Sequence, residues 1–142
     1  MRKTMCKLSA IGGVVLAFLC VLIVFALFFS PVFERGESYE FYMGANSSSL
    51  TVRSKNPALD KLLLPSVAGE SVRYRGDRKD ALLKKFRAEV LFEEEADGVV
   101  NYYCHSPLLK KGVLLNGYTV NLHIALSKEQ TAAGTPLIFG GF

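Results

Sequence analysis

The stretch VLLNGYTVNLHIALS, residues 113–127, decides the fold that we expect for this chain. At its centre, Asn116-Gly117 is typical of a type I′ turn, because both central residues of that turn must adopt a positive φ. The β-prone residues on either side of the turn predict two antiparallel strands joined by a two-residue loop. We therefore expect a hairpin at this point.

The residues after this turn, Tyr118 to Ser127, alternate between apolar and polar side chains. Alternation with a period of two predicts a strand that buries one face and exposes the other. We expect Leu122 and Ile124 to point into the core, and we expect His123 to point outward into solvent. The strand would thus define the inner face of a sheet.

A second hairpin is predicted by Asp97-Gly98, which has the same turn chemistry and lies between two β-prone runs, 90–94 and 99–105. The other predicted strands are shorter and cover residues 39–43, 50–53, 70–75, 113–115 and 136–139. These segments predict an antiparallel sheet of about five or six strands.

Two helices are predicted between these strands. Asn56-Pro57 provides a capping residue followed by proline, which is typical of the start of a helix, and Pro65 ends that helix. Asp77 caps a second helix, whose apolar residues recur at helical spacing through Ala88. The predicted fold class is α+β, a small antiparallel sheet with one or two helices on one face.

The first quarter of the chain is strongly apolar. Residues 8–33 contain no charged side chain, and about 20 such residues are enough for a helix to cross a membrane. We therefore predict a basic tail at 1–7, a transmembrane anchor at 8–33 and an extracytoplasmic domain at 34–142. A cleaved signal peptide is the alternative, although its apolar region would be shorter.

The direction of this predicted anchor follows from its flanking charges. Arg2, Lys3 and Lys7 precede it, and the positive-inside rule places such residues in the cytoplasm. The predicted location is the cell membrane, with a single pass, a cytoplasmic N-terminus and the C-terminal domain on the other side.

Composition limits the classes of function. A chain of 142 residues has room for one domain, and 14 basic and 13 acidic residues remain after the apolar segment. A domain so close to neutral makes nucleic acid an improbable partner on net charge. Cys104 is the only cysteine after residue 20, so no disulfide can form within the domain.

Five polar residues on the hairpin strands are candidates for chemistry. Asn101, Tyr103 and His105 share one face of their predicted strand, and Asn121 and His123 share one face of theirs. If the two strands pair in register, the imidazoles and amides could converge for metal binding or acid–base work. The alternative is that these residues form the solvated side of the sheet. No common catalytic or phosphate-binding motif accompanies them.

A second candidate surface is the polar face of the predicted helix at 77–88. Its basic residues are Arg78, Lys79, Lys84, Lys85 and Arg87. Such a face is either simply solvated or a surface for an anionic polymer or lipid headgroups.

The C-terminal third contains three short motifs: Tyr103-Cys104-His105-Ser106-Pro107-Leu108, Asn121-Leu122-His123-Ile124-Ala125-Leu126 and Gly134-Thr135-Pro136-Leu137-Ile138. With these motifs the chain resembles the end of the YwmB family of Firmicutes. The resemblance implies a bacterial envelope protein with a domain like the TATA-box-binding protein, of unassigned molecular function and with no known catalytic residues. The DNA-binding implication of that name conflicts with a near-neutral domain.

The function expected from the sequence is a membrane-anchored extracytoplasmic binding or accessory module of the cell envelope. We expect it to be non-enzymatic and to need no cofactor, with an envelope protein or an anionic polymer as partner. One alternative is a metal-dependent or acid–base enzyme that uses His105 and His123. The other is a nucleic-acid-binding domain.

Overall fold

The computed structural model describes the backbone of residues 2–28, 30–44 and 50–139, and in the first helix it describes the side chains of residues 11–27. The chain divides into two compact units, residues 1–30 and residues 31–142. Each unit is described by itself.

The first unit contains α1, Arg2–Phe28, whose described side chains are apolar on all sides and exposed. Among the residues that the structure describes, no helix is long and apolar enough to cross a membrane. This finding contradicts the predicted transmembrane anchor at 8–33, together with the single-pass location that depended on it.

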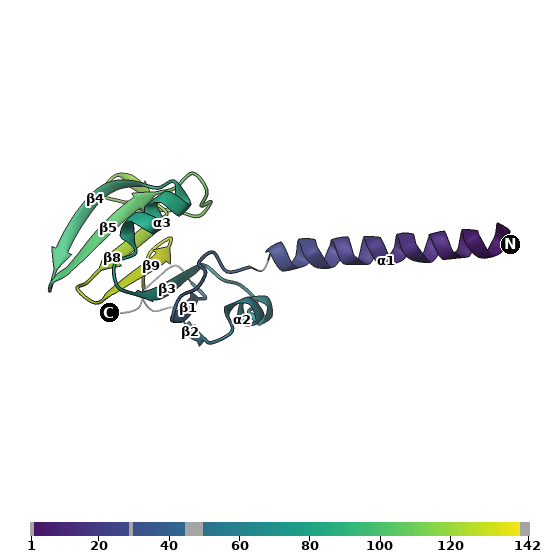
Figure 1. The fold of residues 1–142 in the computed structure, drawn as a ribbon. Helices are drawn as coiled ribbons and strands as arrows, with labels where there is room; N and C mark the ends of the chain where they lie inside the picture. Colours follow the sequence, from purple (N-terminus) through teal and green to yellow (C-terminus); the bar gives the residue numbers. More distant parts are fainter. Residues whose placement is uncertain (1, 29, 45–49, 140–142) are drawn as a thin grey trace. The chain divides into compact units, whose positions relative to one another are not determined.

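The second unit is built around one antiparallel sheet (Figure 1). Its seven strands occur in the order β2-β1-β3-β9-β8-β5-β4. Their bounds are β1 Ser38–Tyr42, β2 Thr51–Ser54, β3 Gly69–Arg75, β4 Glu89–Ala96, β5 Val99–His105, β8 Leu122–Leu126 and β9 Gln130–Thr135. A separate two-stranded sheet pairs β6, Val113–Leu115, with β7, Tyr118–Val120.

Two helices accompany the sheets, α2 at Pro57–Leu63 and α3 at Lys79–Phe86. Nine strands and three helices are present in the described part of the chain, and the strands predominate in residues 31–142. The predicted α+β class with a transmembrane helix and five or six strands is therefore wrong. It placed the last strand at 136–139 and missed β9, whose two alanines and glycine have little intrinsic preference for a sheet.

Both predicted turns are confirmed. Asp97 and Gly98 have φ values of 53° and 76°, and Asn116 and Gly117 have φ values of 49° and 83°. Positive φ at both central residues is what a type I′ hairpin turn requires. The turns join β4 to β5 and β6 to β7 in antiparallel register.

The long strand predicted at 118–127 is interrupted at Asn121. The residues before it belong to β7 and those after it to β8, in different sheets. The Asn121 side chain accepts a hydrogen bond from the Ser106 N–H at 2.6 Å and donates to the Ser106 and Leu109 carbonyls at 2.7 and 2.9 Å. The Asn121 side chain therefore satisfies backbone groups of the neighbouring loop, and at this residue the chain passes from one sheet to the other.

One face of the seven-stranded sheet, the helix face, packs against α3. The row Tyr39, Val72, Ala133 and Ile124 runs across four strands in register, and every member is buried. Leu82 and Phe86 of α3 complete this core, and the Phe86 ring meets Phe33 edge-on with centroids 5.5 Å apart. The prediction that Leu122 and Ile124 point into the core is confirmed.

The opposite face, the back face, is crossed by residues 136–139. These residues were predicted as the last strand, but that strand is β9 and the chain turns after it. A Cβ atom on Gly134 would lie 2.8 Å from both the Leu137 carbonyl oxygen and Ile138 Cγ1, so the crossing needs glycine there. The Phe139 ring contacts Tyr42 edge-on at 5.2 Å. The segment 136–139 thus covers the centre of the back face.

A buried carboxylate holds the beginning of the second unit against the sheet. Glu70 on β3 is 3% exposed, and its Oε1 accepts hydrogen bonds from the N–H groups of Val32 and Phe33. Its Oε2 lies 2.7 Å from Lys61 Nζ on α2. Because α2 buries no residue, this ion pair and the 2.6 Å hydrogen bond from Ser54 to Asp60 are its main attachments among the described residues.

We predict that the Glu70–Lys61 pair is strongly coupled. Glu70→Gln should lower the free energy of unfolding by about 3 kcal/mol, because it removes the buried carboxylate that pairs with the largely buried Lys61 ammonium at 2.7 Å. The double variant Glu70→Gln/Lys61→Met should recover at least about 1 kcal/mol of that loss in urea denaturation. Glu37→Gln, which breaks the exposed Arg75–Glu37 pair, is the control and should change stability by less than about 0.5 kcal/mol. If the changes in unfolding free energy caused by Glu70→Gln and by Lys61→Met simply add up in the double variant, the coupling is refuted.

Candidate functional site

Three rings form a stacked column on the back face of the sheet. Tyr103 on β5 is paired in register with His123 on β8, and their rings lie 4.6 Å apart at an interplanar angle of 12°. Phe92 on β4 stacks on the other side of Tyr103 at 4.5 Å and 18°. The ring faces within this aromatic column therefore cover one another.

His123, at the inner end of the column, is buried and has partners on both ring nitrogens. Its Nε2 lies 3.1 Å from Asn101 Oδ1, and its Nδ1 accepts a hydrogen bond from the Ile138 N–H at 3.3 Å. Burial lowers the pKa of His123 to about 4, so the imidazole is neutral at pH 7. The prediction that His123 faces solvent is wrong, because the segment 136–139 covers it.

The five predicted polar residues do not form one site. Asn101, Tyr103 and His123 lie together, whereas His105 is exposed at the end of β5, where its Nδ1 contacts the Thr119 carbonyl at 3.0 Å. Asn121 is buried in the loop interaction described above. Among the described residues, no group of three or more histidine, cysteine or acidic side chains could hold a metal ion. The geometry gives the two imidazoles no shared catalytic position.

Cys104 offers no nucleophile either. The side chain is fully buried in the core on the helix face, and burial raises the pKa of its thiol to about 12. A thiol in such surroundings stays protonated and inert at neutral pH.

The basic face of α3 is the predicted surface that the structure leaves open. Leu82 and Phe86 point into the core, so the charged residues of α3 point away from it. Lys79 is partly engaged, with its Nζ 3.5 Å from Asp80 and 4.9 Å from the centre of the Tyr102 ring. Arg78, Lys84 and Arg87 are exposed and form no ion pair within the described ranges. The helix therefore presents unneutralised cations to solvent.

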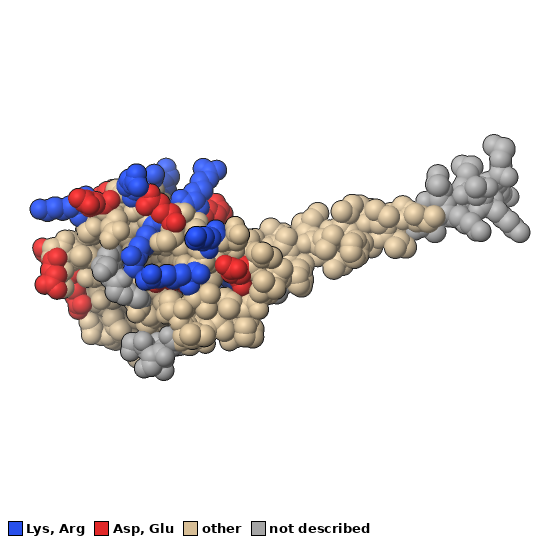
Figure 2. All heavy atoms as spheres, turned by 90° about the horizontal axis from the view of Figure 1, so that it is seen from below, with Lys and Arg blue, Asp and Glu red and all other residues tan. Residues whose placement is uncertain are grey.

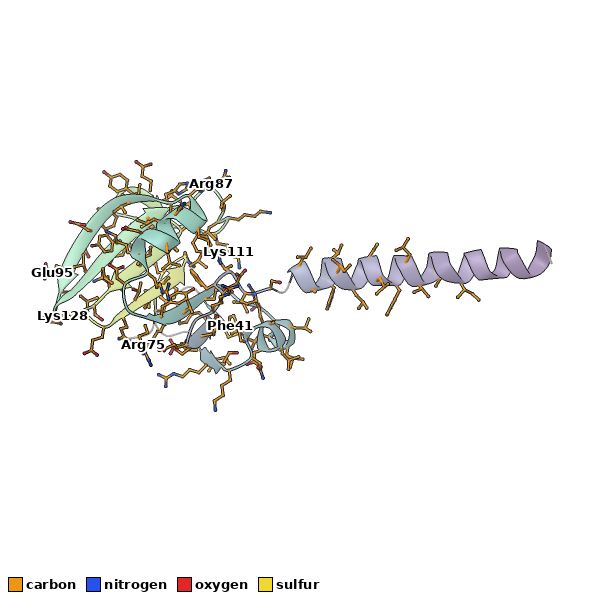
Figure 3. The ribbon with its side chains drawn as sticks, viewed as in Figure 1. Phe41, Arg75, Arg87, Glu95, Lys111 and Lys128 are labelled. Carbon is orange, nitrogen blue, oxygen red and sulfur yellow. The ribbon has the colours of Figure 1, made fainter. Side chains whose placement is uncertain are left out.

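The charges on the surface of the 31–142 unit are mixed. Figure 2 shows Lys and Arg side chains along one edge and across the middle of the visible face, with Asp and Glu side chains among them and a further acidic cluster at one end. Arg87 lies at the end of α3, and Glu95 and Lys128 lie at the opposite end of the unit (Figure 3).

A hollow of about 450 Å³ lies beside α3, and we call it the basic hollow. Its lining consists of Glu34, Arg35, Tyr74, Arg78, Ala81, Leu82 and Lys85. Three of these residues are cations, and the only carboxylate is that of Glu34, 3.7 Å from Lys85 Nζ. The hollow thus combines α3 with the segment that precedes β1.

Arg35 is the member of this site that the sequence did not reveal. No motif surrounds it, and Phe33, two residues earlier, packs against Phe86 of α3 and so helps to bring Arg35 beside that helix. The sequence predicts no element at residues 34–38, since a contact between segments so far apart leaves no local signal.

Tyr74 forms a wall of the basic hollow. Its hydroxyl donates a hydrogen bond to the Glu34 carbonyl at 3.1 Å. Burial, with the charges of Tyr39 and Glu34 adding to it and Arg78 opposing it, raises the pKa of Tyr74 to about 12. The phenol is therefore a neutral hydrogen-bond donor at physiological pH.

A larger hollow, about 920 Å³, lies among the turns at one end of the sheet. Its charged residues are Glu37, Arg75, Asp97, Lys128 and Glu129, of which Arg75 and Glu37 pair at 3.2 Å. Mixed charges at exposed turns select no particular ligand, so its volume alone does not make it a site.

We predict that His123 makes the domain sensitive to acid. The unfolded chain binds a proton at this residue near pH 6.5, whereas the folded chain binds it only near pH 4. Acid therefore favours the unfolded state, and the free energy of unfolding should fall by about 3 kcal/mol between pH 6.5 and pH 4 from this group.

The check is urea denaturation at several pH values. His123→Gln should remove this part of the pH dependence, while His105→Gln, at the exposed histidine, should retain it. The same pH profile in His123→Gln and in the wild type would show that His123 is not the group responsible.

Comparison with family models, with curated proteins and with solved structures found no match for this chain. The resemblance to the YwmB family is tested by none of these comparisons and stays a prediction.

Proposed function

We propose that residues 31–142 form a non-enzymatic binding module that holds an anionic polymer on the basic surface of α3. This basic surface consists of Arg78, Lys79, Lys84, Lys85 and Arg87, with Arg35 beside it. The observation that carries the proposal is the basic hollow, where three cations from two segments meet on an exposed surface beside one carboxylate.

The sheet itself offers less room for a partner. On the helix face the central strands are covered by α3, and on the back face they are covered by residues 136–139. Binding through a face of the central strands would require one of these covers to move. The outward side of α3 needs no such rearrangement.

The dispersion of the charges favours a polymer over a single small anion. Arg78 and Arg87 are nine residues apart, which corresponds to roughly 13 Å along a helix. One exposed cation paired with one anion contributes less than about 1 kcal/mol, so useful affinity needs several contacts along a repeating chain. The unit as a whole is near neutral, and the attraction is therefore local to this surface.

The two alternatives gain no support from the geometry. An acid–base enzyme would need His105 and His123 at one position, and the structure gives them separate partners. A single-strand nucleic-acid site would need ring faces free for stacking, but the faces within the aromatic column cover one another.

We predict salt-dependent binding of long-chain inorganic polyphosphate, measured by titration calorimetry with the full chain. Affinity should fall steeply between 50 and 200 mM salt, because the polymer releases counterions when it binds. Lys84→Gln/Arg87→Gln should lower the slope of log affinity against log salt by about 1 for each charge removed.

The matched control is Lys55→Gln/Lys128→Gln, which removes two exposed cations outside α3 and should leave the slope nearly unchanged. Equal losses in both double variants, or no binding at 50 mM salt, would overturn the proposed function.

A further inference from the structure

We propose that the basic hollow is a subsite for one terminal phosphate group, so that the ligand is a phosphate-bearing anion whose end enters beside Arg35. The inference rests on the proposed function and narrows its ligand class. It concerns Arg35, Arg78 and Lys85, whereas Lys84 and Arg87 lie on the helix outside the hollow.

The position of Arg35 is fixed by the backbone around it. Phe33 is anchored in the core, and the Glu37 N–H donates to the Arg73 carbonyl at 2.8 Å. Between them, the Gly36 N–H donates to the Tyr39 hydroxyl at 2.7 Å, and a Cβ atom on Gly36 would overlap Val72. The segment therefore lies tightly on β3, and Arg35 adopts a left-handed φ of 57° next to α3. Binding at this position therefore requires no ordering of the backbone.

The cations of the hollow are of the kinds that bind phosphate. Arg35 and Arg78 carry guanidinium groups, planar forks of N–H donors that suit pairs of phosphate oxygens, and Lys85 adds a point charge. A terminal phosphate offers three acceptor oxygens on one atom, whereas a carboxylate offers two, so a phosphate can place one oxygen against each of the three cations.

The charge of the hollow also fits. Three cations and the Glu34 carboxylate leave a formal charge of +2 around the empty space. A terminal phosphate carries about −1.5 to −2 at pH 7, which neutralises it, whereas an internal phosphodiester carries a single charge. The end of a phosphate chain is therefore a better match than its middle.

Glu34 provides a test in which removing a side-chain charge should raise the affinity instead of lowering it. Its carboxylate lies 3.7 Å from Lys85 Nζ, where an incoming phosphate would compete for the same cation. Removing this carboxylate should strengthen binding, whereas removing a surface acid elsewhere should have little effect.

These contacts favour a ligand that carries no nucleobases. Tyr74 is the only aromatic side chain that lines the hollow, and its hydroxyl is already bonded to the Glu34 carbonyl. The aromatic column belongs to the other face of the sheet, since its residues alternate with the core row on β5 and β8. A nucleic acid would thus gain nothing at this subsite beyond its phosphate end.

The experiment compares tripolyphosphate, inorganic phosphate and polyglutamate with the full chain by titration calorimetry at 50 mM salt. We expect Arg35→Gln to weaken tripolyphosphate binding by about tenfold and Glu34→Gln to strengthen it severalfold. The matched controls lie outside the hollow: Glu129→Gln for the acidic Glu34 and Lys55→Gln for the basic Arg35. Each control should leave the affinity for tripolyphosphate within about twofold of the wild-type value. Polyglutamate should bind more weakly than tripolyphosphate and should not respond to Arg35→Gln.

Every outcome distinguishes the two proposals. If tripolyphosphate binding is unchanged in both Arg35→Gln and Glu34→Gln, the subsite is overturned. The proposed function survives that result if the Lys84→Gln/Arg87→Gln variant still loses salt-dependent binding of the long polymer. Equal responses of polyglutamate and tripolyphosphate overturn the phosphate assignment alone. If a single-stranded oligonucleotide bound more tightly than tripolyphosphate and lost that binding in Tyr118→Ala, the result would favour a nucleic acid as ligand. It would overturn the proposal that the ligand carries no nucleobases. Thermal melting monitors folding, and Glu34→Gln keeps the test decisive if Arg35→Gln does not fold.

Discussion

The buried Glu70 carboxylate is the interaction on which the arrangement of the second unit depends. It accepts two backbone N–H groups from the start of the unit and neutralises Lys61 of α2, so one side chain on β3 fixes two segments distant in sequence. A charge buried at 3% exposure is tolerated only when its oxygens are satisfied in this way. Because Val32 and Phe33 are held, the residues after them lie against β3 and bring Arg35 to α3. The basic hollow thus depends on a buried carboxylate that lies outside it.

The local features of the sequence were sufficient for the parts of the fold that are decided locally. Asp97-Gly98 and Asn116-Gly117 require a positive φ wherever they occur between strands, and both turns form. The alternation around Leu122 and Ile124 indicated the inner face of the sheet correctly, because their burial depends only on the period of the strand. α3 likewise has Leu82 and Phe86 on its buried side.

The errors occur where distant segments meet. Asn121 interrupts a strand because its side-chain amide donates to the Ser106 and Leu109 carbonyls, and the sequence around Asn121 gives no signal of these hydrogen bonds. His123 is buried because the chain returns across Gly134, and Arg35 belongs to the candidate site because Phe33 is anchored elsewhere. In α2, Leu59 and Leu63 are exposed, and the helix is held by Lys61 and Asp60. Sequence periodicity cannot distinguish these outcomes, because it records amphipathicity without recording which side is covered.

The place of β9 in the sheet determines when the fold can form during synthesis. It is the last of the described strands to leave the ribosome, yet it lies between β3 and β8, at the centre of the strand order. Before it emerges, β1, β2 and β3 can pair with one another, and so can β4, β5 and β8, but nothing joins the two groups in the sheet. The nascent chain therefore exposes the inner edges of both groups until residue 135 has emerged from the ribosome, and a delay at that stage leaves two open edges to pair with other chains. The centre of this sheet is completed last, so the domain acquires its cooperativity only after nearly all of its sequence has been made.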